Sequence, residues 1–118
     1  MIPDNLTDFL AVRQWLTAYA SHWKSSSEEA EQRRKLQLLH RYCEFAQLNP
    51  DALIANLLRE TATGKQIRLK RRRVEMQRIE EFETQIGGGE ARAGREAGNT
   101  IRSFFIHNGV ALTATPFR

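Results

Sequence analysis

The sequence has a single cysteine, Cys43, only three prolines and no long apolar run. One cysteine excludes an internal disulfide and most zinc sites. No apolar stretch approaches the roughly 20 residues that a membrane-spanning helix needs. The opening stretch MIPDNLTDFL lacks a basic n-region and an apolar h-region, so no secretory signal is expected. We therefore expect a cytoplasmic protein in a reducing compartment, without a membrane partner.

Residues that commonly carry catalysis are sparse and scattered. The three histidines, His22, His40 and His107, fall in separate segments and lack the i, i+4 spacing of a helical metal site. Cys43 has apolar helical neighbours, which favours a small buried hydrophobe over a reactive thiol. The glycines at 87–89 follow no strand pattern and precede no lysine, so they do not predict a phosphate loop. We expect no catalytic residue, no metal site and no cofactor, and the chain by itself is not expected to be an enzyme.

Basic residues are abundant, and they concentrate in the second half of the chain. The net charge is +4 over 118 residues, a length that suits one domain. Residues 1–64 have a net charge of −1 and residues 65–118 a net charge of +5. The stretch KQIRLKRRR (65–73) contains six basic residues and no acidic one. Such a block favours a polyanionic partner, although a solvated helix surface explains it equally well.

Apolar periodicity predicts an all-α fold without strands. The expected helices cover 4–20, about 25–48, 50–60, about 67–86 and about 91–107. Polar or glycine-rich segments at 21–27, 61–65 and 87–90 separate them.

Three helix ends carry recognisable signals. Ser25 with Glu28, or Ser26 with Glu29, fits a capping box at the start of the second helix. Asn49-Pro50-Asp51 is typical of a helix start, because asparagine caps and proline suits the first helical position. Gly109 is expected to end the last helix in a left-handed conformation.

Apolar stripes predict which helix faces are buried. Ile101, Phe104 and Phe105 lie at i, i+3 and i+4, so the adjacent phenylalanines belong to one core-facing stripe. The second and fourth helices have comparable stripes, formed by Leu36, Leu39, Tyr42, Cys43, Phe45 and Ala46, and by Leu69, Met76, Ile79, Phe82 and Ile86.

A polar stripe lies on another side of the last helix. Arg92, Arg95, Asn99 and Arg102 recur at intervals of three and four. Arginine can form bidentate contacts with guanine or phosphate and asparagine can pair with adenine, so the stripe suits a major groove. Ordinary surface solubility is the alternative. Gly94 and Gly98 cost helix stability, which indicates a frayed first turn, a close approach to a backbone or ordering on binding.

Four short motifs, in their order and spacing, resemble the core-binding domain of tyrosine recombinases, the phage-integrase family. They are Tyr42-Cys43-Glu44-Phe45, Pro50-Asp51-Ala52-Leu53-Ile54, Arg102-Ser103-Phe104-Phe105 and His107-Asn108-Gly109-Val110. The resemblance covers about residues 10–112. It implies a SAM-like bundle of four or five helices, built from two crossed helical hairpins. The family's catalytic Arg, Lys, His-x-x-Arg and Tyr set is absent, which implies a non-catalytic fragment or a stand-alone remnant.

The resemblance further implies double-stranded DNA as the partner. It places DNA contacts on the start of the second helix and on the last helix: Gln32, Arg33, Lys35, Arg92, Arg95, Asn99 and Arg102. Additional phosphate contacts are expected from Arg68, Arg71 and Arg72. In this scheme 1–24 is an N-terminal helix and linker, 25–112 the core bundle, and 113–118 a tail toward a catalytic domain in a longer protein. Other recombinase subunits on the DNA would be further partners.

Two other functions remain open from the residues. A helical interaction or dimerisation module could use the basic helix for an acidic protein, with no nucleic-acid role. A small antitoxin or repressor would also bind DNA, but normally as a symmetric dimer that contacts two half-sites.

Overall fold

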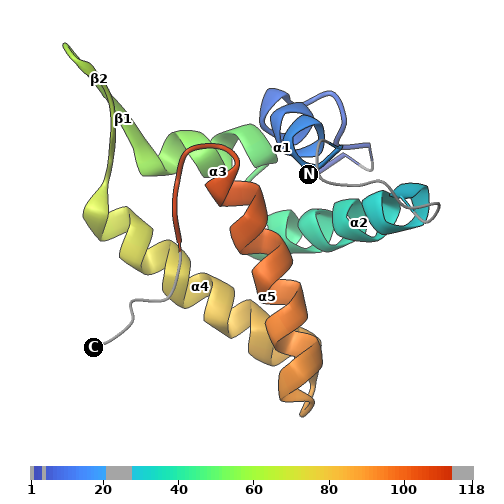
Figure 1. Ribbon diagram of the computed structural model, residues 1–118. Coiled ribbons are helices and arrows are strands. Elements are labelled where there is room, and N and C mark those ends of the chain that lie inside the picture. The colour runs from blue at the N-terminus through green and yellow to red at the C-terminus, as the bar shows by residue number, and fades with distance from the viewer. Residues whose placement is uncertain (1, 4, 21–27, 113–118) are drawn as a thin grey trace.

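The computed structural model describes residues 2–3, 5–20 and 28–112. They form helices α1 (Leu10–Ala20), α2 (Glu28–Ala46), α3 (Pro50–Leu57), α4 (Leu69–Gly87) and α5 (Ala91–Ile106), with strands β1 (Leu58–Thr61) and β2 (Gly64–Ile67) between α3 and α4. The fold is therefore mostly helical, as expected. Helix α5 runs through the centre, with α4 on one side and α2 on the other, and β1 and β2 project from the body (Figure 1).

The core forms around the end of α5, as its apolar stripe predicts. Ile101, Phe104 and Phe105 are fully buried. Trp15 of α1 meets the Phe104 ring edge-on at 5.5 Å between centroids, and Tyr42 of α2 meets the Phe105 ring edge-on at 6.4 Å. Edge-to-face pairs of this kind add to the free energy gained from burial. The adjacent phenylalanines thus join α1 and α2 to the same helix.

The predicted signals at the ends of α3 and α5 are confirmed. Asn49 accepts a hydrogen bond from the backbone N–H of Ala52 at 2.7 Å, and Pro50 occupies the first turn of α3. After α5, the N–H of Val110 donates to the carbonyl of Phe105 at 2.9 Å across Gly109, whose φ is +89°. This Schellman arrangement needs a residue that tolerates positive φ, which glycine does without strain.

The absence of strands was predicted wrongly. Helix α3 ends at Leu57, and the chain continues as an antiparallel hairpin that pairs Leu58 with Ile67 and Thr61 with Gly64. Gly64 follows the tight turn with φ of +129°, a value that side chains rarely permit. The predicted loop at 61–65 is therefore the tip of a hairpin, whose strands are too short for a clear alternating pattern.

Helices α4 and α5 approach closely because α5 has glycines at the contact. A Cβ atom at Gly94 would clash with the backbone carbonyl of Glu83, and one at Gly98 would clash with the Glu83 side chain. The two glycines thus serve a close approach, and the partner is α4 of the same chain. Both lie within the continuous helix α5 and are buried, which excludes the frayed first turn.

Other boundaries and burials differ from the predictions in detail. Helix α1 begins at Leu10, not near residue 4, and Leu10 is exposed. Leu69, expected in the buried stripe of α4, is 65% exposed because the first turn of α4 extends beyond the core. The capping-box serines at 25 and 26 and the tail at 113–118 lie outside the described residues. Among the described helices, none has the length and apolar character needed to cross a membrane.

Candidate nucleic-acid interface

Helices α2 and α5 bring one predicted contact residue from each helix, Lys35 and Asn99, into a shared hollow. Arg34 of α2 and Glu96 of α5 form an ion pair at 3.6 Å. Lys35 and Asn99 both line a hollow of about 250 Å³ between the helices. We call the surface formed by residues 31–41 and 92–102 the α2–α5 face.

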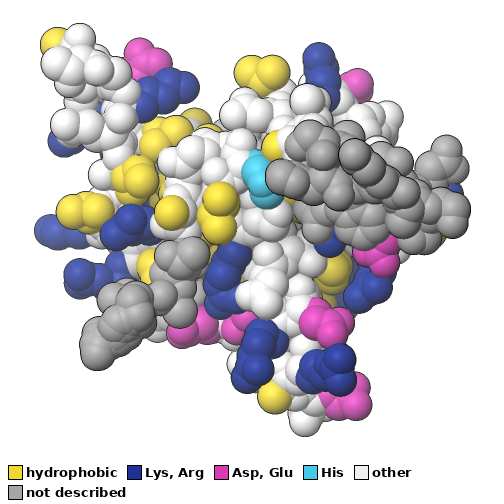
Figure 2. Space-filling view, viewed as in Figure 1, with side chains coloured by type: hydrophobic (Ala, Val, Ile, Leu, Met, Phe, Trp, Pro, Cys, Tyr) yellow, Lys and Arg dark blue, Asp and Glu magenta, His cyan; other side chains and the backbone are white. Residues whose placement is uncertain are grey.

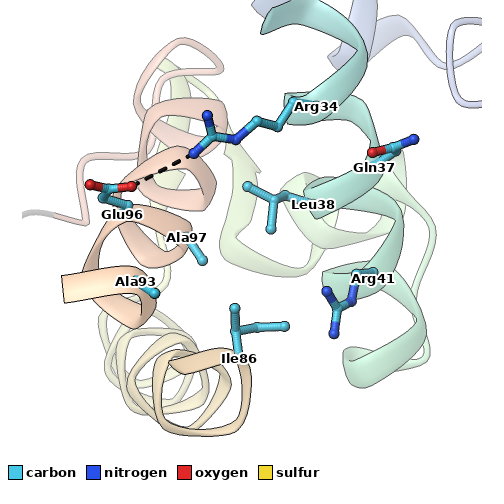
Figure 3. A pocket seen from close by; sticks show the side chains of 8 residues that line it. All are labelled: Arg34, Gln37, Leu38, Arg41, Ile86, Ala93, Glu96 and Ala97. Carbon is cyan, nitrogen blue, oxygen red and sulfur yellow. Dashed lines mark ion pairs between the residues drawn. The ribbon is translucent and has the colours of Figure 1, made fainter. Parts of the chain in front are cut away.

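A second hollow on this face lies beside the end of α4 (Figure 3). Its volume is about 290 Å³, and Leu38, Ile86 and Ala97 contribute apolar surface to it. Arg34 extends across one side toward Glu96, while Arg41 lies at the other (Figure 3). Arg34 and Arg41 were not among the predicted contacts. Arg34 lies four residues before Leu38 and Arg41 three residues after it, and this helical spacing could have indicated that both share its side of α2.

Two predicted residues of α2 do not line the hollows that α2 shares with α5. Arg33 lines an adjacent hollow with Leu36 and His40. Gln32 is exposed. In the same hollow, His40 Nδ1 lies 3.5 Å from a Glu44 carboxylate oxygen, which is consistent with a boundary histidine. Of the residues predicted on α2, only Lys35 therefore lines a hollow that α2 shares with α5.

The polar stripe of α5 is exposed at three of its four positions. Arg92 is 94% exposed and lies 3.5 Å from Glu96, whereas Arg95 is exposed with no ion pair to any described residue. Asn99 is exposed and accepts a hydrogen bond from Arg102 at 3.1 Å. These three side chains can reach a ligand in solvent.

Arg102 is held within the chain. Its guanidinium donates to the Glu83 carboxylate of α4 at 2.8 Å, and the two side chains are only 19% and 20% exposed. Gly98, one turn before Arg102, makes room for the Glu83 side chain. The pair therefore belongs to the α4–α5 contact, and Arg102 is less available to DNA than Arg95.

The three predicted phosphate contacts lie in a different region, around the hairpin and the start of α4. We call residues 58–74 the basic arm. This segment has seven Lys/Arg and one Glu, a net charge of +6, whereas the other 101 residues have 11 Lys/Arg and 13 Asp/Glu, a net charge of −2. Arg68 and Arg72 form no ion pair with a described residue, and Arg71 donates to the Asn56 side chain. The basic run at 65–73 is evident in the sequence, but Arg59 joins it only through the hairpin, which was not predicted.

A buried polar network fixes α4 to α2 just beyond the basic arm. Glu75 is 1% exposed, accepts a hydrogen bond from the Tyr42 hydroxyl, and pairs with Arg78 at 3.1 Å. Burial raises the pKa of Glu75, while Tyr42 and Arg78 oppose that rise. Burial, followed by the nearby carboxylates of Glu75 and Glu44, raises the pKa of the Cys43 thiol to about 12. Cys43 is thus a buried thiol, as its neighbours predict.

Within the described ranges, no group of three or more His, Cys, Asp or Glu side chains is arranged to hold a metal ion. Scans of the sequence and structure against protein-family models, curated proteins and solved structures found no match.

Proposed function

We propose that the protein is a DNA-binding module, similar to the core-binding domain of tyrosine recombinases, that contacts duplex DNA through the α2–α5 face. The SAM-like arrangement is part of this proposal: α2 with α3 and α4 with α5 would be the two crossed helical hairpins. Cleavage and rejoining of DNA would require a separate catalytic domain. The role proposed for this chain is to hold and orient the site.

One observation carries the proposal. Lys35 and Asn99 come from helices far apart in the sequence, yet they line the same hollow. The resemblance assigned both residues to the DNA side, the spacing on α5 independently indicated Asn99, and the packing of α2 against α5 supports that assignment. Arg92 and Arg95 are also exposed on α5. Guanidinium groups can bind phosphates or guanine edges, and Asn99 can bind adenine.

The proposal is tested by anisotropy titration of a labelled duplex at about 50 mM salt, where phosphate contacts are strongest. Arg92→Ala with Arg95→Ala should weaken binding by about thirty-fold or more, because each of the two lost contacts is worth about 1 kcal/mol or more. Glu80→Ala with Glu81→Ala, on the exposed side of α4, is the matched control and should not weaken it. Absence of duplex binding by the unaltered chain contradicts the proposal.

A protein-interaction module is the second candidate, and the exposed apolar side chains favour it. They are Leu10, Leu69, Val74 and Ile106, which are 67%, 65%, 56% and 41% exposed. Light scattering separates the two candidates. A tight dimer whose mass and stability do not respond to duplex DNA would support this second function.

A further inference from the structure

The basic arm differs from the rest of the surface because it has almost no acidic side chains to neutralise its Lys and Arg residues. Arg59, Lys70 and Arg73 are exposed, and none forms an ion pair with a described residue. Glu60 is the only acidic residue of the arm and stands opposite Lys65 in the hairpin register. Figure 2 shows Lys and Arg side chains along the margin where α4 begins, whereas acidic side chains lie among the basic ones near the start of α5.

This concentration of charge works against the stability of α4. The N-terminus of a helix carries a partial positive charge and favours acidic residues. The first turn of α4 has no acidic residue, and the N-cap residue Arg68 makes no side-chain capping bond. Lys70, Arg71 and Arg72 therefore add positive charge where the helix already has it. A bound polyanion would relieve this repulsion.

The position of the arm separates it from the α2–α5 face. The hairpin and the start of α4 lie on one side of α5, and α2 extends on the opposite side (Figure 1). The longest extent of the protein is 44 Å. Ligands bound to the arm and to the face would therefore lie on different sides of the protein.

The distribution of the cations suits a phosphate backbone. Successive helical residues differ in direction by about 100°. Lys70, Arg71, Arg72 and Arg73 therefore spread around the start of α4 and do not form a flat patch. Long side chains arranged in this way can reach phosphates on both strands that border a groove, and such contacts need no particular base sequence.

We propose that the basic arm binds the phosphate backbone of a second DNA duplex while the α2–α5 face holds the first, so that one chain bridges two duplexes. This inference rests on the proposed function for the first duplex only. Binding to the second is independent of base sequence and depends steeply on salt.

The test uses the full chain with one duplex immobilised and a second, labelled duplex of unrelated sequence in solution. The chain should retain the labelled duplex on the beads. Lys70→Ala with Arg72→Ala and Arg73→Ala should reduce that retention at least ten-fold and leave binding of the immobilised duplex within about three-fold. For binding of the labelled second duplex, the same variant should lower the slope of log K against log salt by about 2 to 3, since each phosphate contact contributes about 0.9.

The controls keep this test separate from that of the proposed function. Alanine suits helix interiors, so the triple variant should fold, and circular dichroism checks that it does. Glu80→Ala with Glu81→Ala, on the same helix, should leave retention unchanged. Sedimentation should give one chain for two duplexes. A chain that binds one duplex but never retains the second overturns the inference alone, as does retention that survives the triple variant. A chain that binds no duplex overturns both proposals.

Discussion

The α2–α5 face and the basic arm are both rich in arginine, but they differ in what surrounds the guanidinium groups. On the face, Arg34 and Arg92 share Glu96, and Arg102 is held by Glu83. Of the seven Lys and Arg side chains in the arm, only Lys65 lies opposite an acidic residue, Glu60, in the hairpin. A count of basic residues therefore does not distinguish guanidinium groups that acidic side chains of the same chain neutralise from those, such as Arg95 and the cations of the arm, that form no ion pair with a described residue.

The two regions also differ in how they are fixed to the core. Helix α5 lies against α4 through buried glycines and connects to Trp15 and Tyr42 through Phe104 and Phe105. The arm has one buried link to α2 immediately after it, through Glu75. The face should therefore be a rigid surface whose shape depends on packing. Substitutions in the arm should change binding with little effect on the fold.

The largest effect is expected at the α4–α5 contact. Gly94→Ala places a methyl group against the Glu83 backbone carbonyl, and the helices must separate to admit it. Overpacking of this kind costs about 3 kcal/mol, which outweighs the gain of about 1 kcal/mol in helix propensity. Urea unfolding should show the loss. Arg95→Ala, at an exposed position of the same helix, should remain within about 0.5 kcal/mol of the unaltered chain. If Gly94→Ala were as stable as the unaltered chain, the close contact between Gly94 and the Glu83 backbone would be contradicted.

The link between α2 and α4 should have the next largest effect, and it should depend on pH. Tyr42→Phe removes the hydroxyl that donates to buried Glu75 and should cost about 2 kcal/mol near neutral pH, since a buried acceptor loses its partner. The pKa of Glu75 is raised on folding, so its contribution to stability is present at low pH and is lost as pH rises through the folded pKa. The cost of Tyr42→Phe should therefore be smaller in acid, where Glu75 is protonated.

Unfolding measured across the acidic to neutral range checks this expectation. Glu75→Gln is the companion variant, because the amide can still accept from Tyr42 but does not titrate. Its stability should be flatter against pH than that of the unaltered chain. A cost of Tyr42→Phe that is the same at every pH would remove Glu75 from the explanation.

The elements that could be predicted from sequence are those fixed by residues within one or two turns. Asn49 and Gly109 act on backbone groups three to five positions away, so their local sequence suffices. The apolar stripe that contains Phe104 and Phe105 is local in the same sense. Its partner Trp15 lies 88 or more positions away, and no local pattern identifies that contact.

The candidate site could be predicted only in part, for the same physical reason. The spacing of Arg92, Arg95 and Asn99 placed them on one exposed side of a helix, which the structure confirms. Arg102 continues that spacing, but Glu83 on a neighbouring helix holds it. The exposure of Leu69 likewise depends on where the core ends, because α4 begins before it reaches α2. Such properties are set by tertiary partners and are not visible in periodicity.

A smaller effect should separate the two arginines within the face. Arg102→Ala leaves the half-buried Glu83 carboxylate without its partner and should cost about 1.5 kcal/mol of stability. Arg95→Ala should cost less than about 0.5 kcal/mol, because no described residue depends on it. The order should reverse for duplex affinity, where Arg95→Ala has the greater loss. Thermal unfolding and anisotropy on the same two variants measure both quantities. Equal effects on affinity would mean that the Glu83 pair opens when DNA binds.

The smallest effect should be a gain of stability in the arm. Arg68 occupies the N-cap of α4 with extended backbone but no capping bond. Arg68→Asp supplies a carboxylate at that end of the helix and should stabilise the protein by about 1 kcal/mol. Arg59→Asp makes the same change of charge in β1, where no helix begins, and should alter stability by less than about 0.5 kcal/mol. Both variants should weaken retention of the second duplex, because both remove a cation and add an anion. If Arg68→Asp stabilises the chain without loss of DNA binding, the unfavourable charge at the start of α4 has no role in binding a polyanion.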